Sequence, residues 1–298
     1  MNEKLLSQED DVKKAAELVS SIGIPSQPSL LLEINKKISR PETGIGDIAD
    51  LISRDVAMSA KLLKMANSAF FGLREKVDSI QRALALIGLK NFNRIILATS
   101  LRDSVGGHGS GTEKFWNHSM TVAGASAYIA KKTGFESEEQ AYIAGLFHDC
   151  GVPMLMKKYP DYPQILDHAL GVVNSASLSG IKKSIIGIEE ERYNTHHCAV
   201  GYLITKSWHL PITIAKSVWY HHYINIDIHN DPVTKRLSAI LLLADYIGGH
   251  ILYLGGSDCP VETEPEWARM HRKAATELCM NAESIKDMKD DLVEKLYG

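Results

Sequence analysis

Five segments of this 298-residue chain each place one imidazole or carboxylate on an otherwise apolar helical stripe. On an α-helix, side chains three and four positions apart share a face, so each of these polar groups is predicted to point into a core. The stripes are His118 with Val122, Ala125 and Ile129; His148 with Ala141 and Ala144; His197 with Gly201, Ile204 and Trp208; His221 with Ile214 and Val218; and Asp245 with Leu237, Leu241, Gly248 and Leu252. Any fold of this chain must accommodate these buried polar groups.

Helical periodicity extends over nearly the whole sequence, and no stretch alternates apolar and polar residues long enough to predict a strand. Residues typical of helix boundaries support this interpretation. They are the capping-box pairs Asp78 with Gln81 and Ser137 with Gln140, the helix stop Gly88, and the first-turn prolines Pro211 and Pro232. We therefore predict an all-α fold, a multi-helix bundle with an N-terminal helical subdomain.

The clearest linker is VGGHGSGT, from Val105 to Thr112, where glycines and hydroxyl residues interrupt any helix. A phosphate-binding loop is excluded here because no Lys-Ser or Lys-Thr pair follows and no strand precedes the glycines. We divide the chain into an N-terminal helical part, residues 1–106, a second helical part, residues 112–255, and a C-terminal part, residues 256–298. The last part is predicted to form two amphipathic helices.

Composition narrows the class of protein. Hydrophobic residues make up 45% of the chain and the formal net charge is -3, which is typical of a soluble protein without a basic field for nucleic acid or membrane. The four cysteines lie far apart, so neither a disulfide framework nor a zinc knuckle is expected. Leu237 to Leu254 is apolar enough to suggest a membrane span, but Asp245 and a Gly-Gly pair favour a buried helix. We expect a cytoplasmic protein.

The inward polar residues point to a metal site. A single histidine on an apolar stripe is more often a hydrogen-bonded core residue than a ligand, but a buried aspartate is costly unless it is paired or bound to a cation. Five such helices would incur this cost repeatedly unless their polar groups converge. Nitrogen and oxygen donors suit Fe, Mn, Zn or Ni. Asp149, next to His148 at a helix end, can reach the same point or bridge two ions.

The order of these residues resembles a known superfamily. The series His118, His148-Asp149, His197, His221-His222 and Asp245 resembles the HD superfamily of metal-dependent phosphohydrolases and contains the elements of its HD-GYP branch. Residues Ile52 to Leu97 resemble the signature of the HDOD domain in the pieces DVAM, ANSAFFG, SI and IGL. AGLFHDCG, HHCAVGYLITKSWHLP and WYHH continue the resemblance, which covers about residues 20 to 250.

The resemblance implies a bacterial, all-helical signalling module with an HD-domain-like bundle. In most HDOD proteins the HD residues have decayed, whereas this chain retains them. By resemblance, one or two divalent transition metal ions (Fe, Mn, Zn or Ni) are expected. The first would be held by His118, His148, Asp149 and Asp245, and a second, where present, by His197 with His221 or His222. In an active protein, His148 and Asp149 would be the catalytic residues, and a metal-bound hydroxide would attack a phosphoester.

Two departures from the HD-GYP branch bear on catalysis. Val152 and Pro153 occupy the stretch where an HDxGK pattern would supply a phosphate-contacting lysine, and YINIDIHNDP replaces the GYP-bearing segment. Both changes remove substrate contacts and leave the metal ligands intact. We interpret the chain as a signal-transduction module that has an HD-type metal site and acts through signalling proteins. The alternatives are a metal-dependent phosphohydrolase acting on a nucleotide or cyclic dinucleotide, and a sensor that binds a nucleotide without cleaving it.

The remaining candidates receive simpler interpretations. Cys150 and Cys198 each directly follow a motif residue, and because adjacent helical positions point about 100° apart, they are interpreted as small core residues rather than ligands. His168 and His196 have no assigned role. Lys157 and Lys158 lie too far beyond Asp149 to be assigned as a general acid. Lys90 and Arg94 are interpreted as part of a solvated helix face, which does not support a nucleic-acid site.

Overall fold

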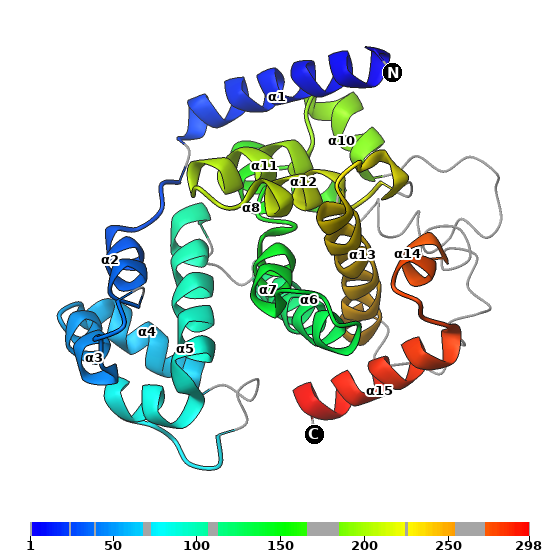
Figure 1. Ribbon diagram of the computed structural model, residues 1–298. Helices are drawn as coiled ribbons and strands as arrows, with labels where there is room; N and C mark the ends of the chain where they lie inside the picture. Colours follow the sequence, from blue (N-terminus) through cyan, green and yellow to red (C-terminus); the bar gives the residue numbers. More distant parts are fainter. Residues whose placement is uncertain are drawn as a thin grey trace. The chain divides into compact units, whose positions relative to one another are not determined.

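The computed structural model describes residues 2–23, 25–38, 40–67, 73–106, 113–165, 185–223, 226–253 and 272–297. Within these ranges all regular structure is helical, which confirms the predicted all-α fold (Figure 1). Four predicted features lie wholly or largely outside the described residues: the linker at 105–112, the ANSAFFG piece at 66–72, His168, and the first part of the C-terminal segment.

The chain forms two compact units. One, called the site unit, consists of Met1–Pro25 and Gly106–Val293; the other, called the small unit, consists of Ser26–Val105 and Glu294–Gly298. The first helix along the chain therefore belongs to the same unit as the HD motif. The domain boundaries drawn from sequence, 1–106, 112–255 and 256–298, stay a prediction.

The small unit is built from four helices whose apolar faces meet in one core. They are α2 (Ser29–Ile38), α3 (Ile45–Ser53), α4 (Val56–Ala66) and α5 (Ile80–Val105). Each contributes fully buried side chains at helical spacing: Leu31 and Ile34, Ile48 and Ile52, Leu62, and Leu84 and Phe92. The repeated spacing of three, four or eight residues explains why these segments bury one face each.

Local hydrogen bonds fix the helix starts in the small unit. Asp55 accepts a hydrogen bond from the Met58 amide at 2.9 Å and so caps α4. The expectation that Asp78 caps α5 is wrong, because Ser79 stands directly before the first helical residue and accepts from the Arg82 amide at 3.2 Å. Gly88 interrupts α5 with a φ of 76°, as expected of a glycine that ends a helix.

Asn67 closes the connection between α4 and α5. Its side-chain amide donates to the Val77 carbonyl at 2.8 Å, and its side-chain oxygen accepts from the Val77 amide at 2.8 Å. One side chain thus satisfies both backbone groups of a residue ten positions away, as a paired strand would. This contact gives a structural role to the asparagine of the ANSAFFG piece.

The site unit consists mainly of α-helices. Its elements are α1 (Asn2–Ile22), α6 (Glu113–Lys132), α7 (Glu138–Phe147), α8 (Val152–Lys158), α10 (Ile185–Tyr193), α11 (His197–Ser207), α12 (Ile212–Tyr220), the 3₁₀ turn η2 (Ile226–Ile228), α13 (Pro232–Tyr253), α14 (Arg272–Glu277) and α15 (Ala282–Tyr297). Within it, α6 packs against α7 and α13, α12 packs against α7, α11 and α13, and α1 lies over α11 (Figure 1).

Two contacts anchor the α11 end of this bundle. The Trp208 indole donates to the Pro25 carbonyl at 2.8 Å and stacks edge-on against Phe147, with ring centroids 5.3 Å apart.

Ser137 accepts from the Gln140 amide at 3.1 Å, which confirms the cap predicted for α7. Pro232 is the first residue of α13, as predicted. The positions at which the helices begin and end set the positions of the polar side chains at their ends.

Helix α13 is a core helix, as the Asp245 and Gly-Gly features suggested. Leu237, Leu241 and Leu243 are fully buried within the unit. Among the described helices, α5 is the one that is long and apolar enough to cross a membrane, and half of its apolar window is buried in the fold.

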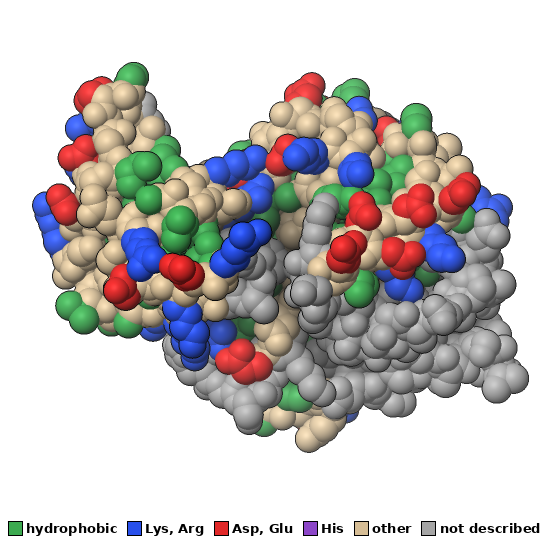
Figure 2. Space-filling view, turned by 90° about the horizontal axis from the view of Figure 1, so that it is seen from below, with side chains coloured by type: hydrophobic (Ala, Val, Ile, Leu, Met, Phe, Trp, Pro, Cys, Tyr) green, Lys and Arg blue, Asp and Glu red, His purple; other side chains and the backbone are tan. Residues whose placement is uncertain are grey.

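In the face seen in Figure 2, acidic and basic side chains are interspersed over the described surface.

The C-terminal segment forms the two helices expected there, as far as it is described. In α14, Ala274 and Ala275 are buried, and the helix packs against α13. In α15, Ile285, Met288 and Leu292 are buried at spacings of three and four residues, so one face is covered.

Gly151 provides a test of how the HD turn is packed. A Cβ atom at this position would overlap the His197 carbonyl oxygen and lie 3.0 Å from the Gly201 amide nitrogen, so the backbones at the starts of α8 and α11 are in direct contact. We expect Gly151→Ala to lower the free energy of unfolding by about 1–3 kcal/mol, because the two backbones must separate. Urea unfolding followed by circular dichroism measures this change.

Gly249→Ala is the matched control. Nothing lies within 4 Å of a Cβ atom at this helical position, so alanine is expected to leave stability unchanged or raise it by up to about 1 kcal/mol. Equal midpoints for the two variants would contradict the close backbone contact at Gly151.

Candidate metal centre

All seven residues predicted as metal ligands lie in the site unit, and most stand at helix ends. His118 lies within α6, His148 caps the C-terminus of α7 and is followed by Asp149, His197 begins α11, His221 caps the C-terminus of α12 and is followed by His222, and Asp245 lies within α13. Helix ends allow side chains from several helices to approach one point. The structure brings all seven together in two adjacent groups.

The first group joins α6, α7 and α13. His118 Nε2 lies 3.0 Å from an Asp245 carboxylate oxygen and 3.3 Å from His148 Nε2. His148 Nε2 lies 3.2 Å from Asp149 Oδ2 and 3.7 Å from Asp245 Oδ1, and His118 Nε2 lies 4.0 Å from Asp149 Oδ2. The donor atoms of His118, His148 and Asp149 therefore lie within 4.8 Å of one another, and Asp245 approaches both imidazoles.

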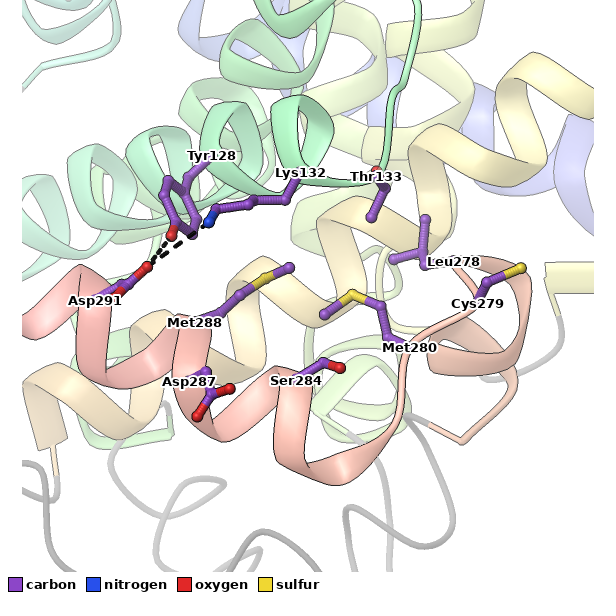
Figure 3. A pocket seen from close by; sticks show the side chains of 10 residues that line it. All are labelled: Tyr128, Lys132, Thr133, Leu278, Cys279, Met280, Ser284, Asp287, Met288 and Asp291. Atoms are coloured by element: carbon purple, nitrogen blue, oxygen red, sulfur yellow. Dashed lines mark hydrogen bonds and ion pairs between the residues drawn. The ribbon is translucent and has the colours of Figure 1, made fainter.

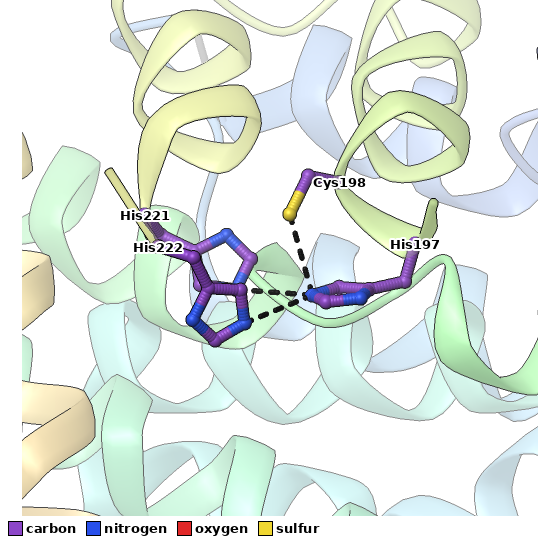
Figure 4. A group of neighbouring side chains, drawn as sticks. All are labelled: His197, Cys198, His221 and His222. Carbon is purple, nitrogen blue, oxygen red and sulfur yellow. Dashed lines mark hydrogen bonds between the residues drawn. The ribbon is translucent and has the colours of Figure 1, made fainter. Parts of the chain in front are cut away.

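The second group joins α11 and α12 to the same aspartate. Asp149 Oδ1 lies 3.2 Å from His221 Nε2 and 3.4 Å from His197 Nε2. His197 Nε2 lies 3.4 Å from His221 Nε2 and 3.0 Å from His222 Nε2 (Figure 4). The sequence left open which of His221 and His222 belongs here. Both approach His197, and His221 also contacts Asp149.

The Nδ1 protons of three imidazoles point away from Asp149. His148 Nδ1 lies 2.7 Å from the Gly145 carbonyl and His221 Nδ1 lies 2.7 Å from the Val218 carbonyl, so each Nδ1–H donates to the backbone three residues earlier. His197 Nδ1 lies 2.7 Å from the Glu189 carboxylate. Such a ring, when it loses its second proton, turns an Nε2 lone pair toward an oxygen of Asp149. Such facing acceptors repel one another unless a cation, either a proton or a metal ion, lies between them.

The electrostatics of the site keep its carboxylates ionised. Burial alone raises the pKa of Asp149, but the facing imidazoles of His148 and His221 outweigh it and hold that pKa well below its ordinary value. Burial likewise raises the pKa of Asp245, and the hydrogen bond from His118 brings it below its ordinary value. These two partly buried carboxylates, whose side chains are 20% and 25% exposed, carry negative charge that must be balanced locally.

The paired histidines His221 and His222 have opposite electrostatics. Burial lowers the pKa of His221, but nearby Cys198 and Asp149 outweigh it and raise that pKa to about 10. Burial and the charge of His221 lower the pKa of His222 to about 3. His222 is therefore neutral, whereas His221 retains its second proton on the Nε2 that faces Asp149.

Glu189, on α10, supports this centre and was not predicted from sequence. Its fully buried carboxylate accepts hydrogen bonds from Tyr162 Oη, from the His197 backbone amide at 3.1 Å and from His197 Nδ1 at 2.7 Å. A carboxylate on the far nitrogen of a ligating histidine fixes its tautomer and orientation. Glu189, Glu190 and Glu191 are consecutive in the sequence. Helical periodicity alone could not show which of the three glutamates is buried.

Cys198 also differs from its sequence interpretation. It is buried, as expected of a core residue, but its Sγ lies 3.3 Å from His197 Nε2, inside the second group (Figure 4). Cys150 fits the core interpretation, since its Sγ approaches the Gly201 carbonyl at 3.8 Å. The two cysteines that follow motif residues therefore have different surroundings.

His196, which had no assigned role, caps α11. Its Nδ1 accepts from the Ala199 amide at 3.3 Å, so its proton resides on Nε2, near Asp11 and Glu190. A protonated Nε2 has no lone pair for a metal ion. This third cluster of nitrogen and oxygen atoms is therefore better suited to a hydrogen bond than to a metal.

The residues around the HD turn carry no phosphate-binding charge. Val152 and Pro153, in place of the lysine-bearing segment, are both buried at the start of α8. Lys158, at the other end of α8, lies 3.0 Å from Ser21 Oγ. A separate hollow of about 330 Å³ lies between α6 and α15, lined by residues such as Tyr128, Lys132 and Asp291, and none of the predicted ligands lines it (Figure 3).

Comparison with protein families identifies one domain in this chain. The model of the HDOD domain matches residues 24–224, which is well over half of the chain. The chain belongs to the HDOD family. HDOD membership confirms the resemblance drawn from sequence, including the stretch from Ile52 to Leu97.

Curated relatives match parts of longer proteins. An uncharacterized protein of Treponema pallidum is 26% identical over 217 residues, which make up 72% of this chain and 41% of that protein. The cyclic di-GMP phosphodiesterase CdgJ of Vibrio cholerae is 20% identical over 151 residues, which make up 48% of this chain and 34% of that protein. This HDOD chain thus spans less than half the length of the relatives it matches.

Solved structures share the fold over nearly the full length. An HDOD domain protein of unknown function from Geobacter sulfurreducens has a TM-score of 0.64 at 24% identity, covering 97% of this chain and 99% of that one. A protein from Shewanella amazonensis, provisionally described as a phosphohydrolase, has a TM-score of 0.64 at 17% identity, covering 95% and 98%. At these identities the likeness shows the HDOD fold alone.

The role of Glu189 can be tested by replacing its carboxylate with an amide. Glu189→Gln places an NH₂ group among three donors, so at least one buried hydrogen bond is lost, and we expect the free energy of unfolding to fall by about 1–3 kcal/mol. Glu190→Gln, a half-exposed neighbour on the same helix, is the control and is expected to unfold like the unaltered protein. Equal denaturation midpoints for both variants would contradict the supporting role of Glu189.

Proposed function

We propose that this chain is a signal-transduction module of the HDOD family whose HD-type centre holds divalent transition metal ions and acts through contacts with signalling proteins. The observation that carries the metal assignment is the environment of Asp149. Both of its oxygens are faced by imidazoles whose Nδ1 protons point elsewhere.

The donor atoms fit a transition metal ion. Zn–N and Zn–O distances near 2.1 Å require ligand atoms about 3.0 Å apart for neighbours in an octahedron and about 3.4 Å apart in a tetrahedron. The donor pairs in both groups, at 3.0 to 3.4 Å, are close to these values, apart from the longer separations of 3.7 and 4.0 Å within the first group. Imidazole and carboxylate donors together favour Fe, Mn, Zn or Ni.

Asp149 is the residue that would be shared between two ions. Its Oδ2 belongs to the group with His118, His148 and Asp245, and its Oδ1 belongs to the group with His197 and His221. Two oxygens that face opposite groups are suited to bridging. A bound ion would lower the pKa of a water ligand toward about 7 and neutralise phosphoryl oxygens.

A regulatory role is favoured over turnover by what surrounds the centre. Phosphoryl transfer depends on cationic groups that position the substrate and stabilise its charge. Val152 and Pro153 are apolar and buried where the HD-GYP resemblance would place a lysine. The centre therefore retains groups for holding ions and lacks this group for holding a phosphoester. A metal-stabilised fold that presents a surface to signalling proteins in the cytoplasm accounts for both facts.

The second candidate is a metal-dependent phosphohydrolase acting on a nucleotide or cyclic dinucleotide. The intact set of His118, His148, Asp149 and Asp245 favours it, because this set includes every residue expected to hold the first ion. In that case His148 and Asp149 would be the catalytic residues. The activity in the name of the Vibrio cholerae relative belongs to a longer protein, of which this chain matches 34%.

Metal stoichiometry tests the two-group arrangement. Asp149→Ala removes a donor from both groups, so we expect it to lose both ions, whereas Asp245→Ala removes a donor from the first group alone and is expected to keep the second ion. Elemental analysis of protein purified without chelator measures the content. Asp290→Ala, at an exposed position on α15, is the control. Full occupancy in Asp149→Ala would contradict the site as described.

Turnover separates the two candidate functions. Metal-loaded protein is expected to leave bis(p-nitrophenyl) phosphate and cyclic di-GMP intact, because Val152 stands where the HDxGK pattern would place a lysine. Release of nitrophenolate is followed by absorbance and cleavage of the dinucleotide by chromatography. Hydrolysis that is lost in Asp245→Ala would contradict the regulatory proposal and favour the phosphohydrolase.

A further inference from the structure

The second donor group contains a sulfur atom that an HD-type site of histidines and aspartates does not require. Cys198 is the second residue of α11, is fully buried, and has its Sγ 3.3 Å from His197 Nε2. One donor atom from each of His197, Cys198, His221 and His222 lies within 4.8 Å of all the others (Figure 4). The sulfur is therefore part of the cluster and does not merely pack against it.

The separations at His197 Nε2 suit ligands of one ion, to which Asp149 Oδ1, 3.4 Å from the same nitrogen, would add a further donor. With metal–nitrogen distances of about 2.1 Å and a metal–sulfur distance of about 2.3 Å, tetrahedral geometry separates two nitrogens by about 3.4 Å and nitrogen from sulfur by about 3.6 Å. The observed nitrogen pairs at His197 are 3.0 and 3.4 Å apart, and its separation from the sulfur is 3.3 Å. These three separations are close to the expected values, and the other donor pairs lie within 4.8 Å.

The orientation of His197 supports coordination. Glu189 holds the Nδ1–H of His197, so its Nε2 lone pair is directed at the point where Cys198, His221 and His222 meet. The simpler arrangement is a hydrogen bond from the Cys198 thiol to this nitrogen. That arrangement uses the lone pair of His197 but gives no reason for two further imidazole nitrogens to converge on it.

We propose that Cys198 is a thiolate ligand of the second metal subsite, which adds sulfur to its histidine nitrogens and the shared Asp149, in contrast to the first subsite, whose donors are nitrogen and oxygen alone. This inference rests on the proposed metal binding and deepens it. Thiolate ligands favour zinc and similarly soft ions over manganese and magnesium. The two subsites of one centre would then differ in the metal ions they prefer.

Cobalt substitution tests this assignment without an activity assay. Co²⁺ bound to a thiolate absorbs in the near ultraviolet through sulfur-to-metal charge transfer, whereas Co²⁺ bound to nitrogen and oxygen alone lacks this band. We expect the band in the unaltered protein, its loss in Cys198→Ser, and its retention in Cys150→Ala. Cys150 is a matched control because it is equally buried and also directly follows a motif residue.

A second variant keeps the test valid should Cys198→Ser fail to fold. In Cys150→Ala/Cys259→Ser/Cys279→Ser, Cys198 is the remaining cysteine, and the charge-transfer band is expected to persist. In competition experiments, Cys198→Ser is expected to weaken zinc binding at one subsite by more than about 10-fold while changing manganese binding less.

The outcomes separate this inference from the proposed function. Cobalt bound by the unaltered protein without a charge-transfer band, or with a band that persists in Cys198→Ser, overturns the thiolate ligand and leaves the metal centre in place. Absence of bound cobalt in the unaltered protein overturns the metal centre, and with it this inference.

Discussion

The contact between Asp149 and the imidazoles around it is the interaction on which the centre depends. An ionised carboxylate in a partly buried site requires positive charge nearby. Three of the imidazoles that face Asp149 already donate their Nδ1 proton to other acceptors. The helices that supply these groups, α7, α11 and α12, must end or begin where they do for the nitrogens to converge. The charge of Asp149 is therefore balanced only when α7, α11 and α12 begin and end at these residues.

Much of this centre could be predicted from sequence because it follows helical periodicity. The stripe positions of His118, His197 and Asp245 identify inward-facing side chains without knowledge of the fold. Glu189 could not be found in this way, because it lies within a run of glutamates and its role depends on α10 meeting α11 in space. Cys198 was assigned to the core by the angle between neighbouring helical residues. That rule describes the Cβ direction, and at the first turn of α11 the Sγ still reaches His197.

The helical fold was predictable for the same reason, while helix boundaries depended on single hydrogen bonds. Ser137 caps α7 as expected, but at α5 two adjacent residues could serve, and the serine next to the first helical residue does so rather than Asp78. The double hydrogen bond between Asn67 and Val77 has no periodic signature at all. It becomes recognisable once the two residues are known to meet across the loop.

The two donor groups together draw on α6, α7, α11, α12 and α13, so that their ligands extend from His118 to Asp245 along the chain. An ion held between such helices would act as a cross-link, restricting the unfolded chain as a covalent bridge does and adding to stability in proportion to the logarithm of its concentration over its dissociation constant. Contacts between residues so far apart in sequence form late, because large loops must close first. The centre would then join the helices only after each has taken its final length, and metal supply would bear on how much of the protein is folded.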